Sequence, residues 1–139
     1  MSSLDRLNSA QRIAAQEIDG PVLILAGAGT GKTNTITCRM GFMVERGISP
    51  DNILAVTFTN KAAREMQQRV AGFISSKNTS DEGKALKPTV CTFHSLCVRV
   101  LRRHIEKLGY KRNFVIYNES EQLGVVKKII SAISGKDVK

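Results

Sequence analysis

VLILAGAGTGKT, residues 22–33, is an apolar run that leads directly into a glycine-rich turn. A short apolar run of this kind predicts a buried strand, and the spacing of Ile36, Met40 and Met43 after the turn predicts a helix. Strand, glycine-rich turn and helix in this order are the context of a phosphate-binding loop. The stretch therefore predicts an α/β fold in which the turn holds phosphates.

Each residue type in the turn suits a bound phosphate. Gly27, Gly29 and Gly31 let the backbone curl with its N–H groups directed inward, where side chains would block the phosphates. The positive end of the following helix faces the same anion. Lys32 then reaches the outer phosphates, and the Thr33 hydroxyl is a ligand for Mg²⁺. The candidate catalytic residues are Lys32 and Thr33, with Thr33 at the metal, and the loop candidates for nucleotide binding are Ala26, Gly27, Ala28, Gly29, Thr30, Gly31, Lys32 and Thr33.

Two other interpretations of the turn were weighed. Ala26 stands where the phosphate-loop pattern usually begins with glycine, so a turn that binds nothing is one alternative. A dinucleotide-binding fingerprint is excluded, because it needs a third glycine at position 32, which is lysine. The intact Gly31-Lys32-Thr33 core favours the phosphate loop.

Length and composition indicate an ordinary globular chain. It has 139 residues, 42% of them hydrophobic and 24% charged, which suits one domain with a modest core. No apolar run approaches membrane-spanning length, and residues 1–5 resemble neither a signal nor a transit peptide. Cys38, Cys91 and Cys97 form no C-x-x-C pair and predict free thiols. We therefore expect an intracellular protein with no membrane partner, in the cytoplasm or nucleoid of a bacterium or the nucleus of a eukaryote.

The charge of the chain is strongly basic and uneven. The formal net charge is +9, of which residues 71–139 carry +7. This balance suggests a polyanionic partner, most simply nucleic acid, although a solvated basic surface is the alternative. Arg99, Arg103 and Lys107 recur one helical turn apart, joined by Arg102, and could line a phosphate backbone or simply face water.

The remaining pattern alternates strands and helices. Residues 53–58, 89–93 and 114–117 predict three more strands, and residues 4–18 predict a first helix with Asn8 or Ser9 as its N-cap. Helices are expected after each strand, with apolar residues such as Ile13, Leu108 and Leu123 facing inward. The polar stretch 75–88 predicts a flexible loop. Together these elements predict a parallel sheet with helices on both faces.

Polar and aromatic residues follow two of the expected strands. In parallel sheets, ligands bind at the carboxyl ends of the strands, where Phe58-Thr59-Asn60 and Thr92-Phe93-His94 lie. Phe58 could stack on a base, but from the residues alone a core position is favoured. Gln11 could pair with adenine, but its spacing alone favours a surface glutamine.

Taken together, these motifs resemble the N-terminal part of superfamily 1 DNA helicases of the UvrD/PcrA/Rep group. Leu7-Asn8-x-x-Gln11 resembles their Q motif, and AGAGTGKT (26–33) resembles their first motif. AVTFTNKAAREM (55–66) and TFHSLCVRVLRRH (92–104) are similar to the two motifs that contact single-stranded DNA. RNFVIYNESEQL (112–123) resembles the segment leading into their inserted subdomain, so the similarity covers nearly the whole chain.

The resemblance implies a partial RecA-like, P-loop NTPase domain over residues 1–139, with 118–139 leading toward an inserted helical subdomain. It implies a 3′–5′ helicase or translocase that uses ATP and Mg²⁺ and acts on single-stranded DNA and duplex junctions. By matching position, Gln11 contacts adenine, and Phe58, Thr59, Asn60, Thr92, Phe93 and His94 lie along the DNA, which reverses the expectation for Phe58.

The sequence departs from the family pattern in three ways that bear on ATP binding and hydrolysis. Asn34 replaces an arginine that commonly stacks on adenine in the family. No apolar strand ending in consecutive acids, the family's Walker B motif, occurs in the 139 residues. The second RecA-like domain, an expected partner, is also outside this sequence. We therefore expect the chain alone to bind nucleotide but hydrolyse little.

Two alternatives of other classes stay open at this point. A self-contained P-loop kinase or NTPase would need an acid near the loop, and Glu119 is its candidate. A non-enzymatic module that binds single-stranded DNA would keep its affinity after Lys32→Ala.

Overall fold

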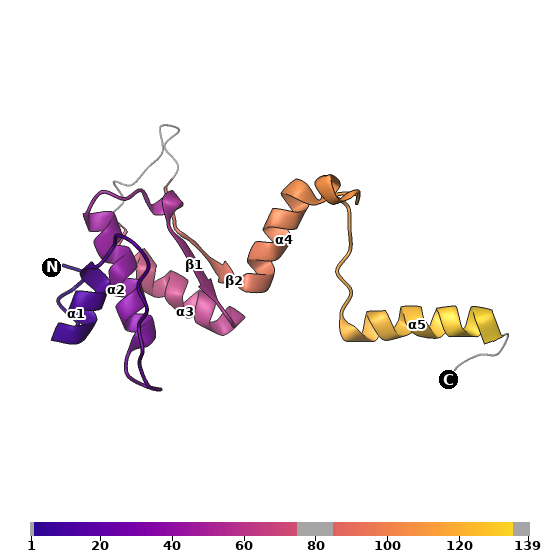
Figure 1. Ribbon diagram of the computed structural model, residues 1–139, viewed down its shortest axis with the longest axis horizontal. Helices are drawn as coiled ribbons and strands as arrows, with labels where there is room; N and C mark the ends of the chain where they lie inside the picture. Colours follow the sequence, from indigo (N-terminus) through magenta and orange to yellow (C-terminus); the bar gives the residue numbers. More distant parts are fainter. Residues whose placement is uncertain (1, 75–84, 135–139) are drawn as a thin grey trace. The chain divides into compact units, whose positions relative to one another are not determined.

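The structure is a computed structural model, and it describes residues 2–74 and 85–134. The chain divides into two units, Met1–Cys97 and Val98–Lys139, each considered by itself. The elements are α1 (Ser9–Gln16), α2 (Lys32–Glu45), the 3-10 turn η1 (Pro50–Asn52), β1 (Leu54–Thr57), α3 (Asn60–Ala71), β2 (Thr89–Thr92), α4 (Phe93–His104), the 3-10 turn η2 (Ile105–Leu108) and α5 (Glu119–Ser134). Figure 1 labels the α-helices and the strands.

Helix α1 begins where a capping box closes its first turn. The Asn8 side chain accepts a hydrogen bond from the Gln11 backbone N–H at 2.9 Å, and the Gln11 side chain accepts one from Asn8 N–H at 3.2 Å. This exchange satisfies two backbone donors that the helix leaves unpaired. Asn8 is thus the N-cap, one of the two candidates, Asn8 and Ser9, that the sequence offered.

The sheet consists of two parallel strands. β1 pairs with β2 in a register that sets Leu54 opposite Thr89 and Thr57 opposite Thr92. Parallel neighbours need a crossover, and α3 supplies it while packing against both strands. The fold is therefore helices around a small parallel sheet, an α/β arrangement.

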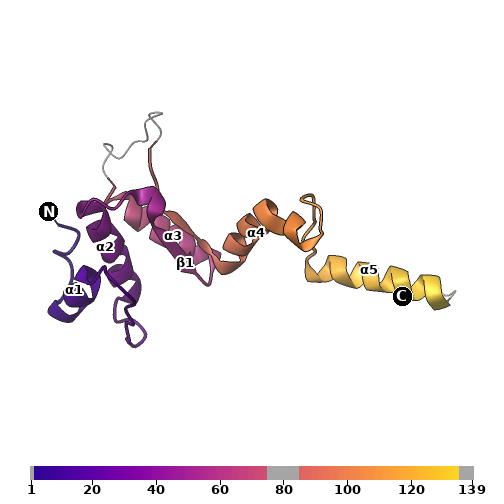
Figure 2. The same ribbon diagram turned by 45° about the horizontal axis from the view of Figure 1, so that its top comes forward.

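Two apolar clusters hold the first unit together. Met40 of α2, Met66 and Val70 of α3, and Ala55 and Val90 of the strands form the larger one. Ala63, Met66 and Val70, which recur at helical spacing along α3, are all buried. The second cluster joins the N-terminal segment to α1 and α2, which lie side by side in Figures 1 and 2.

Helix α2 ends in a left-handed glycine. Gly47 has φ +89°, and the Ile48 N–H donates to the Met43 carbonyl at 3.0 Å. This is the Schellman arrangement in which glycine is favoured, because a Cβ disfavours positive φ. Gly109, at φ +80°, likewise ends η2.

The second unit is built from the end of α4, η2 and α5. The Arg102 guanidinium lies over the Phe114 ring, 5.7 Å from its centroid, and Arg112 pairs with Glu106 at 2.7 Å. Helix α4 stops at His104, and residues 105–108 continue it as the 3-10 turn η2. No helix in the described part of the chain is long and apolar enough to cross a membrane.

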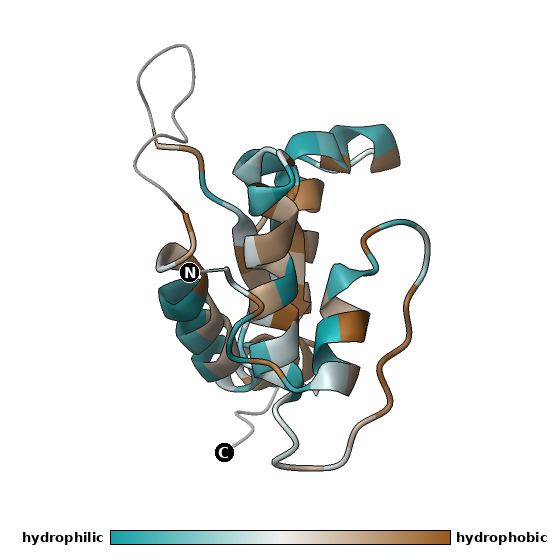
Figure 3. Cartoon of the chain, turned by 90° about the vertical axis from the view of Figure 1, so that its left-hand side faces the viewer, coloured by the Kyte–Doolittle hydropathy of each residue, from teal (hydrophilic) through white to brown (hydrophobic). Residues whose placement is uncertain are grey.

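The expected four-stranded sheet is wrong for two of its strands. Residues 22–25 and 114–117 are extended without pairing in the described structure. Leu23 is 82% exposed and Leu25 86% exposed. Figure 3 shows apolar colouring on the segment that joins α1 to α2, outside the helices. A strand needs a neighbour for its backbone hydrogen bonds, and nothing described pairs with these segments.

Several apolar helix residues that were expected to face inward are exposed, again because no described element covers them. Ile13 is 70% exposed and Ala15 of α1 is buried instead, while Leu108 is 66% and Leu123 55% exposed. No described element packs over these side chains, so a helical apolar stripe alone does not bury them. The predicted loop 75–88 lies mostly outside the described residues.

Candidate functional site

The glycine-rich turn joins an extended segment to the start of α2. Gly29 has φ +77° and Gly31, the N-cap of α2, has φ +84°, a region that residues with a Cβ rarely adopt. Gly27 has no such conformation, so only two of the three predicted glycines are required by backbone geometry. The turn thereby delivers the N-terminus of α2, with its free N–H groups, to the end of the loop.

Lys32 reaches back across the loop. Its Nζ donates to the Ala26 carbonyl at 2.7 Å and also to the Gly27 carbonyl. The Thr30 hydroxyl donates to the same Gly27 carbonyl at 2.7 Å. The Lys32 ammonium therefore lies among the loop carbonyls, beside the N-terminus of α2. An anion bound there would be stabilised by both the lysine and the helix dipole.

Gln11 is the residue of α1 that contacts the loop. Its Nε2 donates to the Thr30 carbonyl at 2.9 Å, while its Oε1 accepts from Asn8. A Cβ at Gly31 would lie 3.0 Å from Gln11 Nε2, so the close approach also favours glycine there. The structure therefore brings Gln11, a predicted adenine contact, to the rim of the loop.

A cavity of about 530 Å³ opens between these elements. It is lined by α1, by the extended segment 23–27 and by the start of α2, with Gln11, Thr30 and Lys32 among its polar residues. Glycine backbone, one lysine and a helix N-terminus are a donor set that fits phosphate oxygens. Thr33, the predicted Mg²⁺ ligand, lies on the first turn of α2 next to Lys32. The threonines that line this cavity are Thr30 and Thr35.

The second group of predicted residues lies at the carboxyl ends of β1 and β2. Phe58 follows Thr57 and Phe93 follows Thr92, and these two threonines are register partners. Phe58 is 86% and Phe93 60% exposed. The core position that Phe58 was first expected to take is therefore wrong, and two rings are open to a ligand on neighbouring strands.

Of the polar residues next to these rings, the two threonines hydrogen-bond to helix backbone, whereas Asn60 and His94 are exposed. Thr59 caps α3 by accepting from Ala62 N–H at 3.2 Å, and buried Thr92 accepts from Ser95 N–H at 3.2 Å. Their hydroxyls thus serve the starts of helices. Asn60 and His94 are exposed beside the rings and are open to a ligand.

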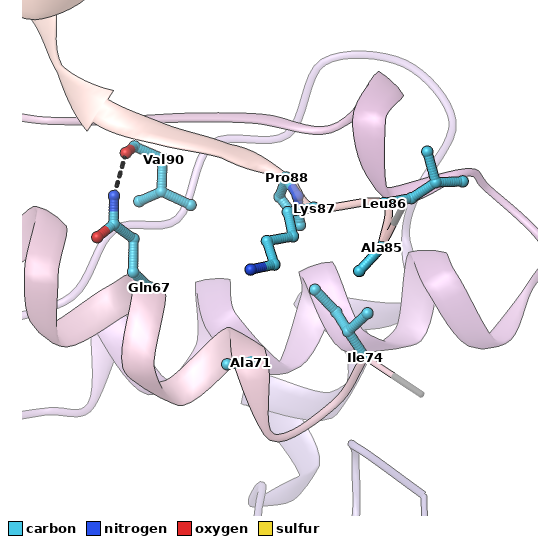
Figure 4. A pocket seen from close by; sticks show the side chains of 8 residues that line it. All are labelled: Gln67, Ala71, Ile74, Ala85, Leu86, Lys87, Pro88 and Val90. Carbon is cyan, nitrogen blue, oxygen red and sulfur yellow. Dashed lines mark hydrogen bonds between the residues drawn. The ribbon is translucent and has the colours of Figure 1, made fainter. Parts of the chain in front are cut away.

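A second cavity, of about 510 Å³, lies between α3 and the segment that enters β2 (Figure 4). Gln67 Nε2 donates to the Val90 carbonyl at 2.7 Å at one end of it. Apolar side chains dominate its lining, and Lys87 is the one charged group among the described lining residues. No group of three metal-ligating side chains occurs in the described ranges.

Comparison with known proteins decides the family. The model of the UvrD/REP helicase N-terminal domain matches residues 7–139. The chain belongs to this family. The similarity to UvrD-type helicases inferred from four motifs is thereby confirmed, and helicase, ATP-binding and DNA-binding are the attributes that go with the UvrD/REP family.

Three relatives illustrate the match to the UvrD/REP family. The chain is 46% identical over 128 residues to the ATP-dependent DNA helicase PcrA of Bacillus subtilis (strain 168). It is 43% identical to PcrA of Staphylococcus aureus (strain Mu50) over 128 residues and 42% identical to PcrA of Staphylococcus epidermidis over 127 residues. Each match covers 91% of this chain but only 16–17% of the relative. The chain therefore spans about a sixth of the length of these helicases.

The hydrogen bond from Gln11 to the loop was not predicted from the sequence. Gln11 was read as an adenine contact or a surface residue, whereas the structure also uses it to tie α1 to the loop through Thr30. The Asn8-x-x-Gln11 spacing is a capping-box signal and could have indicated that Gln11 folds back on its own helix.

Proposed function

We propose that this chain is the ATP-binding portion of a 3′–5′ DNA helicase or translocase that acts on single-stranded DNA. The observation that carries the proposal is the loop at Gly29–Gly31, with Lys32 at its centre and Gln11 bound to its rim. Membership in the UvrD/REP family supports the same function. The fold is then the first part of a RecA-like P-loop NTPase domain.

The nucleotide would be held by residues 26–33. Backbone N–H groups of the loop and the start of α2 would bind the phosphates, and Lys32 would exchange its two carbonyl partners for phosphate oxygens. Thr33 would hold Mg²⁺, which neutralises phosphate charge when bound. Gln11 has one further N–H and a further lone pair to offer adenine. Asn34 lacks the guanidinium with which an arginine would stack on the base, so base stacking would be weaker or would come from elsewhere.

Single-stranded DNA would cross the carboxyl ends of β1 and β2. Phe58 and Phe93 offer faces on which successive bases stack, a sequence-tolerant contact. Asn60 and His94 would bind the backbone beside them, while Thr59 and Thr92 shape the helix starts that carry these groups. The two sites are separate, as required if nucleotide drives motion along a strand.

We also propose that the 139 residues alone hydrolyse ATP slowly. Phosphoryl transfer needs a group that orients the attacking water and acids that hold the metal, and no apolar strand ending in consecutive acids occurs in the sequence. The partners proposed to complete the site are the rest of the helicase, including a second RecA-like domain.

ATP binding and hydrolysis by the chain, with and without oligo(dT), test this proposal. We expect ATP binding that Lys32→Ala abolishes, and no turnover stimulated by DNA. Turnover that disappears in Lys32→Ala would instead mean that the chain is catalytically complete. Glu119→Gln then distinguishes a self-contained NTPase from a helicase fragment. It would abolish turnover only in a self-contained NTPase that uses this acid.

Binding of oligo(dT) tests the strand-end site. Because stacking contributes about 1–3 kcal/mol per base, Phe58→Ala should weaken binding roughly five- to 160-fold. Tyr110→Ala is the matched control, since Tyr110 is 67% exposed in the other unit. Equal affinities in both variants would contradict a stacking role for Phe58.

A further inference from the structure

Arg39 of α2 links this helix to α1 by a hydrogen bond that the proposed nucleotide contacts do not include. Its Nη1 donates to the Ala14 carbonyl at 3.0 Å. Ala14 lies in the last turn of α1, where carbonyl groups have no partner within the helix. A guanidinium near a helix C-terminus satisfies such a carbonyl and interacts favourably with the helix dipole. Arg39 therefore caps the C-terminal end of α1 from the neighbouring helix.

The structure favours this use of the Arg39 side chain over others. The last turn of α1 has no basic side chain of its own, and in the part of the chain that the structure describes Arg39 forms no ion pair. Ala15 and Cys38, the sequence neighbours of Ala14 and Arg39, belong to one apolar cluster and are 0% exposed. The hydrogen bond therefore lies beside a packed contact between the two helices, partly shielded from water.

The side of α2 that carries Arg39 also carries residues of the nucleotide cavity. Lys32, Thr35 and Arg39 recur at i, i+3 and i+7, so they share one side of the helix. Lys32 and Thr35 line the cavity of about 530 Å³, and Ala14 lines it from α1, whereas Arg39 is not among its lining residues. Arg39 therefore holds the α1 wall of the cavity without reaching the cavity itself.

Gln11 lies on α1 one turn before Ala14, and it is the second point at which hydrogen bonds attach this helix. Its Nε2 donates to the Thr30 carbonyl of the loop at 2.9 Å. The apolar cluster between the helices is non-directional, so it does not fix the rotation of α1 as hydrogen bonds do. A hydrogen bond also stabilises less when it must order the group that carries it. The position of Gln11 therefore depends on the bond that Arg39 makes.

We propose that Arg39 is a positioning residue for nucleotide binding, which fixes α1 so that Gln11 meets the loop and the bound nucleotide. This inference rests on the proposed function, in which the loop binds ATP and Gln11 contacts it. Because Arg39 does not line the cavity, its effect on ATP passes through α1 and Gln11.

A double-mutant cycle of ATP affinity tests the proposal, with Arg39→Met, Gln11→Ala and both changes together. Methionine keeps much of the apolar stem of arginine and removes its donors. Because one hydrogen bond is lost, Arg39→Met alone should weaken ATP binding about two- to tenfold. In the Gln11→Ala background the same change should have almost no further effect, because residues that act as one network are not additive.

Two further variants separate positioning from charge. Arg39→Lys keeps the charge and a donor, and the Ala14 contact uses a single N–H, so lysine should restore most of the affinity lost in Arg39→Met. Arg46→Met is the matched control, because it removes the same charge from an exposed position at the end of α2. It should leave ATP affinity unchanged. Circular dichroism checks that each variant is folded, and Arg39→Gln replaces Arg39→Met in the cycle if the methionine variant is not.

Additive losses for Arg39 and Gln11 in folded variants would overturn the proposal, as would an equal loss in Arg46→Met. Unchanged ATP affinity in the folded Arg39 variant would overturn it too, and would leave the proposed function intact as long as Lys32→Ala abolishes binding. ATP binding that survives Lys32→Ala would contradict the proposed function, and this inference with it.

Discussion

Gln11 joins three features of the candidate site through one side chain. It closes the capping box of α1, holds the Thr30 carbonyl of the glycine loop and borders the cavity beside Lys32. A hydrogen bond of this kind contributes about 0.5–1.5 kcal/mol, so its loss is felt at the loop without unfolding the chain.

Gln11→Ala should therefore weaken nucleotide binding by up to about tenfold. Titrations with ATP and GTP separate its two roles. Equal losses for both nucleotides indicate that Gln11 acts by holding the loop, whereas a loss confined to ATP indicates that it reads adenine. Gln16→Ala, at the exposed end of α1, is the control and should change neither affinity.

The cysteines differ in reactivity for a physical reason. Burial raises the pKa of the Cys38 thiol, with Glu45 adding to the increase and Arg6 opposing it. Cys97 is exposed. Since the thiolate is the reactive form, at pH 8 iodoacetamide should alkylate Cys97 at least about tenfold faster than Cys38. Peptide mass spectrometry checks this order, and denaturant should abolish the difference; comparable rates in the folded chain would mean that Cys38 is accessible.

At the scale of elements, α2 is positioned by a glycine in its interior. A Cβ at Gly41 would lie 2.8 Å from both Phe73 Cγ and Ser3 Cβ, so the helix approaches its neighbours too closely for alanine. Glycine costs a helix up to about 1 kcal/mol relative to alanine, and here packing overrides that propensity.

Gly41→Ala should destabilise the first unit by about 1–3 kcal/mol, because the overpacking exceeds the gain in helix propensity. Urea unfolding followed by circular dichroism measures the change. Gly124→Ala in α5 is the matched control: nothing lies within 4 Å of a Cβ there, so propensity alone should act and stability should not fall. A stabilised Gly41→Ala would mean that Phe73 and Ser3 move aside at little cost.

At the scale of the whole molecule, exposed apolar segments set the behaviour in solution. Val22–Leu25 is an unpaired extended segment with Leu23 and Leu25 more than four-fifths exposed. Such a segment offers backbone hydrogen bonds and apolar surface to any second strand.

The double variant L23K/L25K should therefore associate less than the unsubstituted chain at the same concentration. Sedimentation velocity over a range of concentrations measures this. Q16K/Q68K, which adds the same charge at exposed polar positions, is the control for simple repulsion. Equal suppression in both variants would show that net charge, not the apolar segment, governs association.

Much of the candidate site could be predicted from the sequence because its determinants are local. Backbone sterics at Gly29 and Gly31, the cap at Asn8 and the stripe of α3 all act within a few residues. The motif order also sufficed for the family, which the match over residues 7–139 confirmed. The site roles of Lys32, Thr33, Phe58 and the other candidates stay predictions.

Only the tertiary structure decided which apolar residues are buried. VLIL (22–25) and FVIY (114–117) have the composition of strands, yet they stay unpaired, and the apolar side of α5 stays open. The tertiary structure likewise decided that Phe58 is exposed beside Phe93 and that Gln11 reaches Thr30. The physical reason is that turns and caps are stabilised by neighbours in sequence, whereas a strand or an apolar face is stabilised only by the element that packs against it.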